Sequence, residues 1–171
     1  MKILLKPLQI LYVIYAMILF LIMMLVVVPF VLVASFFGKI KGGNAVMRIV
    51  HWWADAWLFL IGISHKRIVE QEIRAHQPYI FVSNHNSYMD IPQMLKAIRQ
   101  PLRILGKAEM GKIPVFGIIY NAAVVPVLRG SAENRAKSVK TLRSVLSHEI
   151  SIYIAPEGTF NMTDKPLIDF Y

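Results

Sequence analysis

Residues 79–92 of the sequence read YIFVSNHNSYMDIP. The apolar run Tyr79–Ser83 predicts a buried strand, and the residues Ile91–Ile98 predict a short helix beyond the polar segment that follows it. The pattern continues downstream, because apolar runs alternate with helical segments. This alternation predicts an α/β fold with a mixed sheet layered with helices, in which sites lie just past strand ends. The further strands are expected at Leu102–Leu105, Val124–Leu128 and Ser151–Ala155, and the further helices at Lys112–Tyr120 and Ser131–His148.

The composition points to contact with lipid. The chain has 171 residues, of which 56% are hydrophobic, and 19 Lys and Arg stand against 10 Asp and Glu. An average soluble domain is less apolar, and disordered or collagen-like chains have a different composition. The absence of cysteine excludes a disulfide scaffold, a thiolate metal site and a thiol nucleophile.

The first part of the chain contains a long uncharged segment. Residues Leu8–Phe37 include no ionisable side chain except Tyr12 and Tyr15. As a helix this segment would be about 45 Å long, against about 30 Å for the hydrocarbon core of a bilayer. It is also much longer than the apolar core of a cleaved signal peptide, so we expect it to stay attached. Pro29 interrupts the segment and Gly38 ends it, which allows a kinked helix or a turn between two membrane-embedded helices.

A second apolar segment, Ala45–Ile63, carries Trp52, Trp53 and Trp57. Tryptophan prefers the headgroup level of a membrane, so this segment is expected at the interface. The alternative is that both segments are buried helices of a soluble protein. The composition becomes that of an ordinary α/β domain from about residue 66. The sequence therefore predicts membrane-embedded helices over residues 1–65 and a separate domain over residues 66–171.

The cations that flank the long apolar segment predict its orientation. Fewer precede it than follow it, and the more basic flank of a membrane segment usually lies in the cytoplasm. We therefore expect the chain to be a membrane protein of the inner or cytoplasmic membrane, with its α/β domain on the cytoplasmic side. The preceding cations are Lys2 and Lys6, and the following ones are Lys39, Lys41, Arg48, Lys66 and Arg67.

The polar segment after the first strand holds a histidine and an aspartate five residues apart, His85 and Asp90. On a straight helix these side chains would point about 140° apart, so a turn must separate them. Asp90 is expected to cap the following helix, which has Pro92 in its first turn. A folded-back loop would let the carboxylate accept a hydrogen bond from one imidazole nitrogen, leaving the other free to take a proton.

The motifs around this pair resemble those of the 1-acylglycerol-3-phosphate acyltransferase family, also called lysophosphatidic acid acyltransferases. The family's first motif, N-H-x4-D, is matched by Asn84, His85 and Asp90. Its second block, a Lys, a Pro, a Gly and then a strand ending in Arg, is similar to Lys107, Pro114, Gly117 and Arg129. Its third block, P-E-G-T-R, is similar to Pro156, Glu157, Gly158 and Thr159, which stand in the same order along the chain.

Two departures from the family pattern matter. Phe160 stands where the family often has Arg, so a cation that could bind phosphate is missing there, and Arg129, Lys107 or Lys165 would have to replace it. The family also has a further apolar strand with prolines downstream of E-G-T, and nothing between Pro166 and Tyr171 corresponds to it. We therefore expect a C-terminally truncated member of the family, with a natural short form as the alternative.

The resemblance implies a reaction and a set of roles. The expected reaction transfers a fatty acyl group from acyl-CoA or acyl carrier protein to the sn-2 hydroxyl of lysophosphatidic acid, giving phosphatidic acid, with no resident cofactor. His85 would be the base and Asp90 would orient it, while Lys107 or backbone N–H groups near Gly158 would stabilise the oxyanion. Arg129 would bind the phosphate, and Glu157 would bind an acceptor hydroxyl or pair with Arg129. The expected substrate-binding residues are Asn84, Lys107, Arg129, Glu157, Gly158 and Thr159.

Other functions are less well supported. His51, His65, His76 and His148 share no spacing that would bind a metal. The formal net charge of +9 could suggest nucleic acid, but seven of the 19 cations lie in the first 67 residues around the apolar segments, and basic and aromatic residues do not interleave elsewhere. We therefore expect membrane lipid as a partner and no nucleic acid. The alternatives that stay open are an acyltransferase for another lysolipid and a non-catalytic, membrane-bound fragment.

Overall fold

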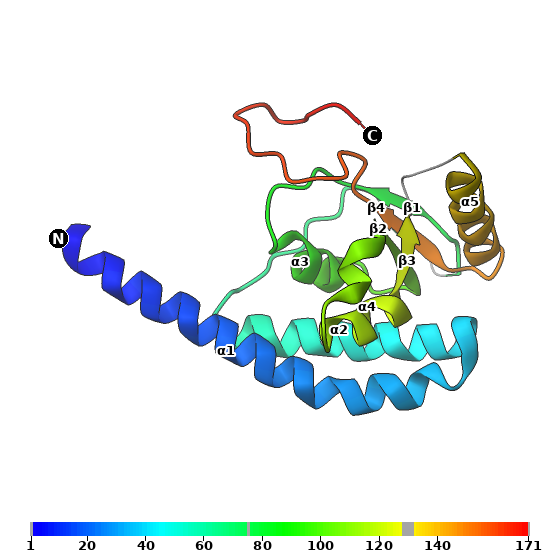
Figure 1. The fold of residues 1–171 in the computed structure, drawn as a ribbon. Helices are drawn as coiled ribbons and strands as arrows, with labels where there is room; N and C mark the ends of the chain where they lie inside the picture. The colour runs from blue at the N-terminus through cyan, green and yellow to red at the C-terminus, as the bar shows by residue number, and fades with distance from the viewer. Residues whose placement is uncertain (1, 75, 128–131, 171) are drawn as a thin grey trace.

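The computed structural model describes residues 2–74, 76–127 and 132–170 of the chain. An antiparallel pair of long helices, α1 (Lys2–Ser35) and α2 (Gly43–Leu60), lies beneath a sheet that is flanked by shorter helices (Figure 1). The turn between α1 and α2 includes a short π-helix, η1 (Gly38–Gly42). The helix α1 runs on through Pro29, so the chain reverses at the glycine-rich turn and not at the proline.

The two helices of this hairpin are held together by aromatic side chains. Phe20 of α1 packs edge-on against Trp53 and Trp57 of α2, with ring centroids 5.0 and 5.5 Å apart. The hydroxyls of Tyr12 and Tyr15 donate to the carbonyls of Ile61 and Leu60 at 2.8 and 2.9 Å. These carbonyls belong to the C-terminal end of α2, where a helix leaves acceptors without partners. The two tyrosines of α1 therefore supply hydrogen-bond donors to the C-terminal end of α2.

The sheet has four described strands in the order β1-β4-β2-β3. Every described pair of neighbours is parallel, so the predicted α/β class is confirmed while the mixed sheet that we expected is parallel in the part described. The alternation of strands and helices explains this, because a helical crossover returns the chain to the same end of the sheet. The strands are β1 (Ile80–Val82), β2 (Leu102–Lys107), β3 (Val124–Val127) and β4 (Ser151–Ile154).

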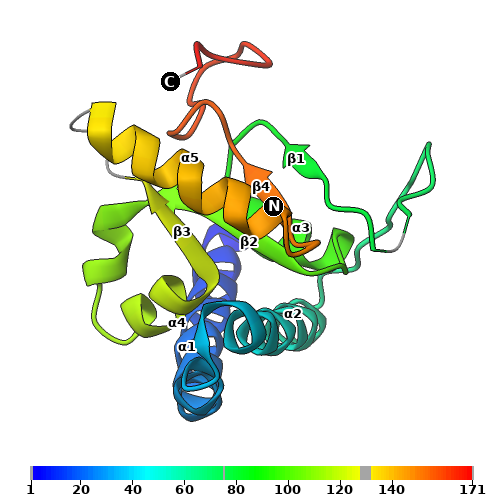
Figure 2. The ribbon, with the colours of Figure 1, turned by 90° about the vertical axis from the view of Figure 1, so that its right-hand side faces the viewer.

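Helices cover both faces of the sheet. The helices α3 (Asp90–Ala97) and α4 (Phe116–Ala123) lie on the face toward the hairpin, and α5 (Ala132–Leu146) lies on the opposite face (Figure 2). A 3-10 turn, η2 (Ala108–Lys112), precedes α4. The main core contains buried residues from α1, α2, α3, β2 and β4, among them Val31, Met47, Leu95, Leu102 and Tyr153. A smaller core of Val145, Ile150 and Ile152 lies under α5.

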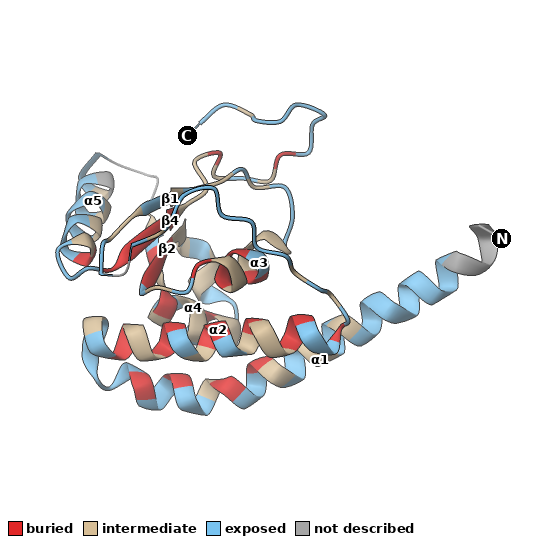
Figure 3. Ribbon diagram, turned by 180° about the vertical axis from the view of Figure 1, so that it is seen from behind, coloured by how far each residue is buried: buried red, intermediate tan, exposed pale blue. Residues whose placement is uncertain are grey.

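The second apolar segment, expected at a membrane interface, also contributes to a protein core. One face of α2 is buried, since Val46, Met47, Ala54 and Leu58 are shielded by the sheet domain and by α1 (Figure 3). Only the opposite face is open, where Trp52 is 62% and Phe59 78% exposed. One face of α2 therefore belongs to a protein core, and its interfacial placement through the other face stays a prediction. Residues of α2 share one core with the sheet. The division of the chain at residue 65 stays a prediction.

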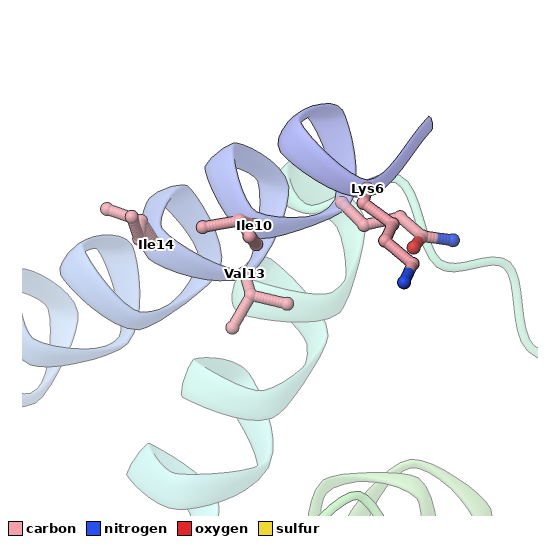
Figure 4. Close-up of a pocket in the computed structure, with 5 residues that line it drawn as sticks. Lys6, Ile10, Val13 and Ile14 are labelled. Atoms are coloured by element: carbon pink, nitrogen blue, oxygen red, sulfur yellow. The ribbon is translucent and has the colours of Figure 1, made fainter. Parts of the chain in front are cut away.

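The first half of α1 differs from α2, because it projects from the rest of the molecule and exposes apolar side chains (Figures 1 and 3). Figure 4 shows Ile10, Val13 and Ile14 on this part of α1, with Lys6 near its beginning. With Gln9 they line an open hollow formed by one helix, away from the strand ends. The segment Lys6–Ser35 is long and apolar enough to cross a membrane.

A buried arginine attaches the hairpin to the sheet. Arg103 of β2 is 4% exposed, and its guanidinium donates to the carbonyls of Lys39 and Ile40 at 3.0 and 3.3 Å, and to Leu102 at 2.8 Å. Gly43 allows this approach, since a Cβ there would collide with the guanidinium. Burial lowers the pKa of Arg103, but arginine remains charged at neutral pH. The contact therefore joins a cation to carbonyls at the turn of the hairpin.

Replacing Arg103 with alanine is expected to lower the free energy of unfolding by about 1–3 kcal/mol, because the carbonyls that it serves would lose their donor in a buried place. The measurement is denaturant unfolding of the detergent-solubilised protein. Arg143→Ala on the exposed face of α5 is the matched control and is expected to change stability by less than about 0.5 kcal/mol. Equal effects of the two changes would mean that Arg103 does not anchor the hairpin.

Candidate active site

The parallel sheet brings three sequence motifs to one edge. The strands β1, β4 and β2 all point the same way, so the segments after Val82 and Ile154 and the last residue of β2, Lys107, lie at their carboxyl ends. His85 follows β1, and Glu157 follows β4. Because β1 and β4 are neighbours in the sheet, the first and third motifs meet directly. This edge is where sites of α/β proteins form.

The side chains of His85 and Asp90 meet as the sequence predicted. The Nδ1 atom of His85 lies 2.9 Å from Oδ2 of Asp90. The same oxygen accepts the backbone N–H groups of Asn86 and Ser87 at 2.8 and 2.9 Å. The loop thus wraps around the carboxylate and holds it against the imidazole. Such a carboxylate selects the tautomer with a proton on Nδ1 and leaves Nε2 able to accept one.

The expectation that Asp90 caps α3 is wrong. Asp90 is the first residue of α3, Met89 occupies the cap position, and no side chain caps the helix. The carboxylate turns back toward the loop because three donors converge on it there, from His85, Asn86 and Ser87. The negative charge still lies at the beginning of a helix, where the helix dipole favours it.

The imidazole of His85 is partly open, with 21% of its side chain exposed. Its Nδ1 atom is paired with Asp90, and the described part of the chain offers no hydrogen-bond partner to Nε2. Phe160 covers one side of the ring, with centroids 4.4 Å apart and planes inclined by 44°. Tyr88 packs in turn on Phe160 at 4.6 Å. Among the described residues, the site therefore has one imidazole nitrogen without a partner, beside an aromatic surface.

A buried tyrosine supports the loop from below. The hydroxyl of Tyr153 lies 2.6 Å from Oγ of Ser83, which itself donates to the carbonyl of Asn84 at 2.9 Å. Burial above all raises the pKa of Tyr153, and the charge of Asp90 raises it further. The tyrosine therefore keeps its proton and donates it to Ser83. This chain of hydrogen bonds connects β4 to the beginning of the loop after β1.

Glu157 has partners other than those we expected. Its side chain is 1% exposed, and its two oxygens accept backbone N–H groups, Oε2 from His85 at 2.8 Å and Oε1 from Ile168 at 3.1 Å. The sequence suggested an acceptor hydroxyl or Arg129 as its partner. Arg129 lies outside the described residues. In the described structure, Glu157 connects the third motif to the backbone of the first.

The other predicted site residues occupy the same edge with different exposure. Lys107, at the end of β2, and Asn84 and Thr159, in the loops after β1 and β4, have exposed side chains. Gly158 has φ of 63° and its N–H donates to the carbonyl of Ala155 at 3.1 Å, so it forms the turn after β4. The backbone N–H of Gly158, which we expected near the oxyanion, therefore bonds within its own turn.

Sequence reasoning missed Asn161, which is 7% exposed. Its backbone N–H donates to the carbonyl of His85 at 2.8 Å. Its side chain accepts from Thr163 and donates to the carbonyl of Lys165, which shapes the following turn. The contact with His85 could not be found from residue types, because both of its atoms belong to the backbone. Among the described residues, no group of three or more His, Asp or Glu side chains could hold a metal ion.

Comparison with known proteins agrees with the motifs. The chain is 26% identical over 130 residues to the 1-acyl-sn-glycerol-3-phosphate acyltransferase of Haemophilus influenzae, covering 73% of this chain and 52% of that protein. It is 32% identical over 117 residues to the lyso-ornithine lipid O-acyltransferase of Pseudomonas aeruginosa, covering 66% of this chain and 42% of that protein. The chain thus spans about half the length of these two relatives.

The fold has a match among solved structures. The crystal structure of the 1-acyl-sn-glycerophosphate (LPA) acyltransferase PlsC from Thermotoga maritima superposes with a TM-score of 0.62 at 24% sequence identity, covering 90% of this chain and 64% of that one. This likeness shows the fold. The sequence model of the Acyltransferase family matches residues 66–170, which include the His85 loop, the end of β2 and the turn after β4. The chain therefore belongs to the Acyltransferase family.

Proposed function

We propose that the chain transfers a fatty acyl group from acyl-CoA or acyl carrier protein to the sn-2 hydroxyl of 1-acylglycerol-3-phosphate, giving phosphatidic acid. The observation that carries this proposal is the 2.9 Å contact between His85 and Asp90, which leaves Nε2 of the imidazole without a described partner. The names of the relatives support a lysophospholipid acceptor. The donor is proposed on chemistry alone, because both candidates present the acyl group as a thioester.

The site supports a direct transfer without an acyl-enzyme. Nε2 of His85 takes the proton of the acceptor hydroxyl while the oxygen attacks the thioester carbonyl. The resulting tetrahedral intermediate collapses, the C–S bond breaks, and the thiolate leaves with the proton from the imidazolium. Asp90 accepts the hydrogen bond from Nδ1 throughout and stabilises the positive charge that the ring carries between the two proton transfers. No oxidant, reductant or cofactor is needed for this balance.

Cations at the strand ends are proposed to handle the negative charges. Lys107 is exposed at the end of β2, where its ammonium can stabilise the oxyanion of the intermediate. The proposed role of Arg129 is to bind the acceptor phosphate, for which a guanidinium is well shaped. Asn84 and Thr159 flank the same edge as further polar contacts. Glu157 is proposed to act differently, as argued below.

A second acceptor class is favoured by one observation. Phe160 stands where a phosphate-binding arginine is common in the family, and it packs on His85 and Tyr88 as an apolar wall. One relative is named for a lyso-ornithine lipid, which differs from lysophosphatidic acid in its headgroup. An acyltransferase for a lysolipid without a phosphate monoester is therefore the second candidate.

The deciding experiment measures acyl transfer in membranes that contain the full chain. Radiolabelled acyl-CoA and acyl-acyl carrier protein are each supplied with lysophosphatidic acid, and in parallel with a lysolipid that lacks the phosphate. Labelled phosphatidic acid would support the first candidate, and a product only from the second acceptor would replace it. If the chain binds lipid but transfers no acyl group to either acceptor, the proposed enzyme activity is contradicted. The chain would then be a non-catalytic membrane protein.

The chain is also proposed to be membrane-bound, with its site on the cytoplasmic side. The exposed apolar surface of α1 supports insertion, and Lys39, Lys41 and Arg48 are exposed around the turn of the hairpin, where they can meet lipid phosphates. Flotation with liposomes tests the binding. Protease accessibility in sealed inverted vesicles tests the side, because a cytoplasmic domain would be digested there and protected in right-side-out vesicles.

A further inference from the structure

The segment after β4 contacts His85 at three separate points. Oε2 of Glu157 accepts the backbone N–H of His85 at 2.8 Å, and the backbone N–H of Asn161 donates to the carbonyl of His85 at 2.8 Å. Between them, the ring of Phe160 packs on the imidazole at 4.4 Å. We call residues 157–161 the clamp. Both backbone groups and the side chain of one histidine are therefore held by a single short segment that lies 72 residues away in the sequence.

Each oxygen of the Glu157 carboxylate accepts a backbone N–H group of the protein itself. It is 1% exposed, and its second oxygen accepts the backbone N–H of Ile168 at 3.1 Å. A buried carboxylate is costly unless its oxygens are hydrogen-bonded, and hydrogen bonds to an ionised acceptor are stronger than neutral ones. These contacts give Glu157 a structural reason to be charged and buried. They also direct each oxygen toward a backbone N–H group.

The other end of the clamp is equally well ordered. Oδ1 of Asn161 accepts the N–H and the hydroxyl of Thr163 at 3.0 and 2.6 Å, and Nδ2 donates to the carbonyl of Lys165 at 2.7 Å. These bonds shape the turn so that the backbone N–H of Asn161 is aimed at His85. The side chain of Asn161 thus acts on the histidine only through its own backbone.

We propose that Glu157 is a positioning residue that holds the base, and not a ligand of the acceptor. This inference rests on the proposed acyl transfer. Asp90 restrains the imidazole through Nδ1, while the clamp restrains the backbone and one ring face of His85. Among the described residues, Nε2 is left without a hydrogen-bond partner. Proton transfer requires the base to be placed within about 0.5 Å of its productive position, so the clamp contributes to turnover and not to acceptor binding.

The test is Glu157→Gln, which keeps the shape but replaces one acceptor oxygen by an NH₂ donor. One of the two backbone N–H groups, of His85 or of Ile168, then loses its acceptor. We expect kcat to fall by about 10- to 100-fold, with the KM for lysophosphatidic acid unchanged within about 2-fold. A rise in this KM with kcat retained would show an acceptor ligand and overturn the proposal. Asp164→Asn, an exposed carboxylate in the following turn, is the matched control and is expected to change neither constant.

A second readout does not depend on activity. The Cε1–H resonance of His85, assigned by its loss in His85→Ala, is expected to be displaced by the ring of Phe160 in nanodisc-bound protein. Phe160→Leu should abolish this displacement, and Glu157→Gln should reduce it, because the histidine moves relative to the clamp. An unchanged resonance in Glu157→Gln would overturn the proposal. If the wild-type chain transfers no acyl group, the proposed function fails, while this resonance still decides the clamp.

A variant that unfolds would not decide the matter, so a second one is included. Asn161→Ala removes the bonds that shape the turn and leaves the carboxylate of Glu157 in place. It is expected to lower kcat and to move the His85 resonance in the same direction as Glu157→Gln. If a folded Asn161→Ala variant keeps the wild-type kcat and resonance, the segment does not position the base.

Discussion

His85→Ala is expected to reduce kcat for acyl transfer by about 10²- to 10⁴-fold, the usual contribution of a general base. We assign Nε2 of His85, which has no partner among the described residues, to accept the proton of the acceptor hydroxyl. The side chain is 21% exposed and sits in a loop, so its removal should leave the fold and the membrane attachment intact. The measurement is turnover of labelled acyl donor by equal amounts of membrane-bound wild-type and variant protein.

The matched control for this prediction is His148→Ala. His148 is exposed beyond the end of α5, where its Nδ1 lies 2.7 Å from the carbonyl of Ser144. Its loss is expected to leave turnover within about 2-fold of wild type, since it lies before the first residue of β4, at the amino ends of the parallel strands and not at their carboxyl ends. Turnover that survives in His85→Ala would refute His85 as the base, whatever the control shows.

Most local elements could be read from the sequence, but the helix expected at Lys112–Tyr120 is displaced. A 3-10 turn occupies Ala108–Lys112, and α4 runs from Phe116 to Ala123. The predicted strand Leu102–Leu105 corresponds to β2 (Leu102–Lys107), and the predicted helix Ile91–Ile98 to α3 (Asp90–Ala97). Short apolar runs bounded by polar or helix-breaking residues carry this information in their own residues. The hairpin was harder, because an apolar side chain on α2 has the same hydropathy whether it meets lipid or protein.

The site shows the same contrast between local and distant contacts. His85 and Asp90 are five residues apart, so a loop that folds back was enough to predict their meeting. The bond between Glu157 and the N–H of His85 depends on the adjacency of β1 and β4, which the sequence does not specify. Arg103 did carry a signal, as a charge inside an apolar strand. Its hydrogen bonds to the carbonyls of Leu102, Lys39 and Ile40 offset the cost of burying it.

Asp90→Asn is expected to lower kcat by about 10²- to 10⁴-fold although it preserves the shape of the side chain. One oxygen of Asp90 accepts from Nδ1 of His85 and from the N–H groups of Asn86 and Ser87. An amide can keep some of these bonds, but it carries no charge to stabilise the imidazolium. If its NH₂ group faces the ring, it also selects the tautomer that has its proton on Nε2, which cannot act as a base.

This change separates a catalytic from a structural role for the carboxylate. If Asp90 only shaped the loop, Asp90→Asn would lower the protein's free energy of unfolding by about 1–2 kcal/mol. The kcat per folded molecule would then be unchanged. Asp55→Asn, which breaks the exposed pair with Arg99, is the control for removing a carboxylate as such. Because Asp90 acts through the imidazole, the double variant His85→Ala, Asp90→Asn should be no slower than His85→Ala alone. A further loss of turnover in the double variant would mean that Asp90 contributes to the reaction independently of His85.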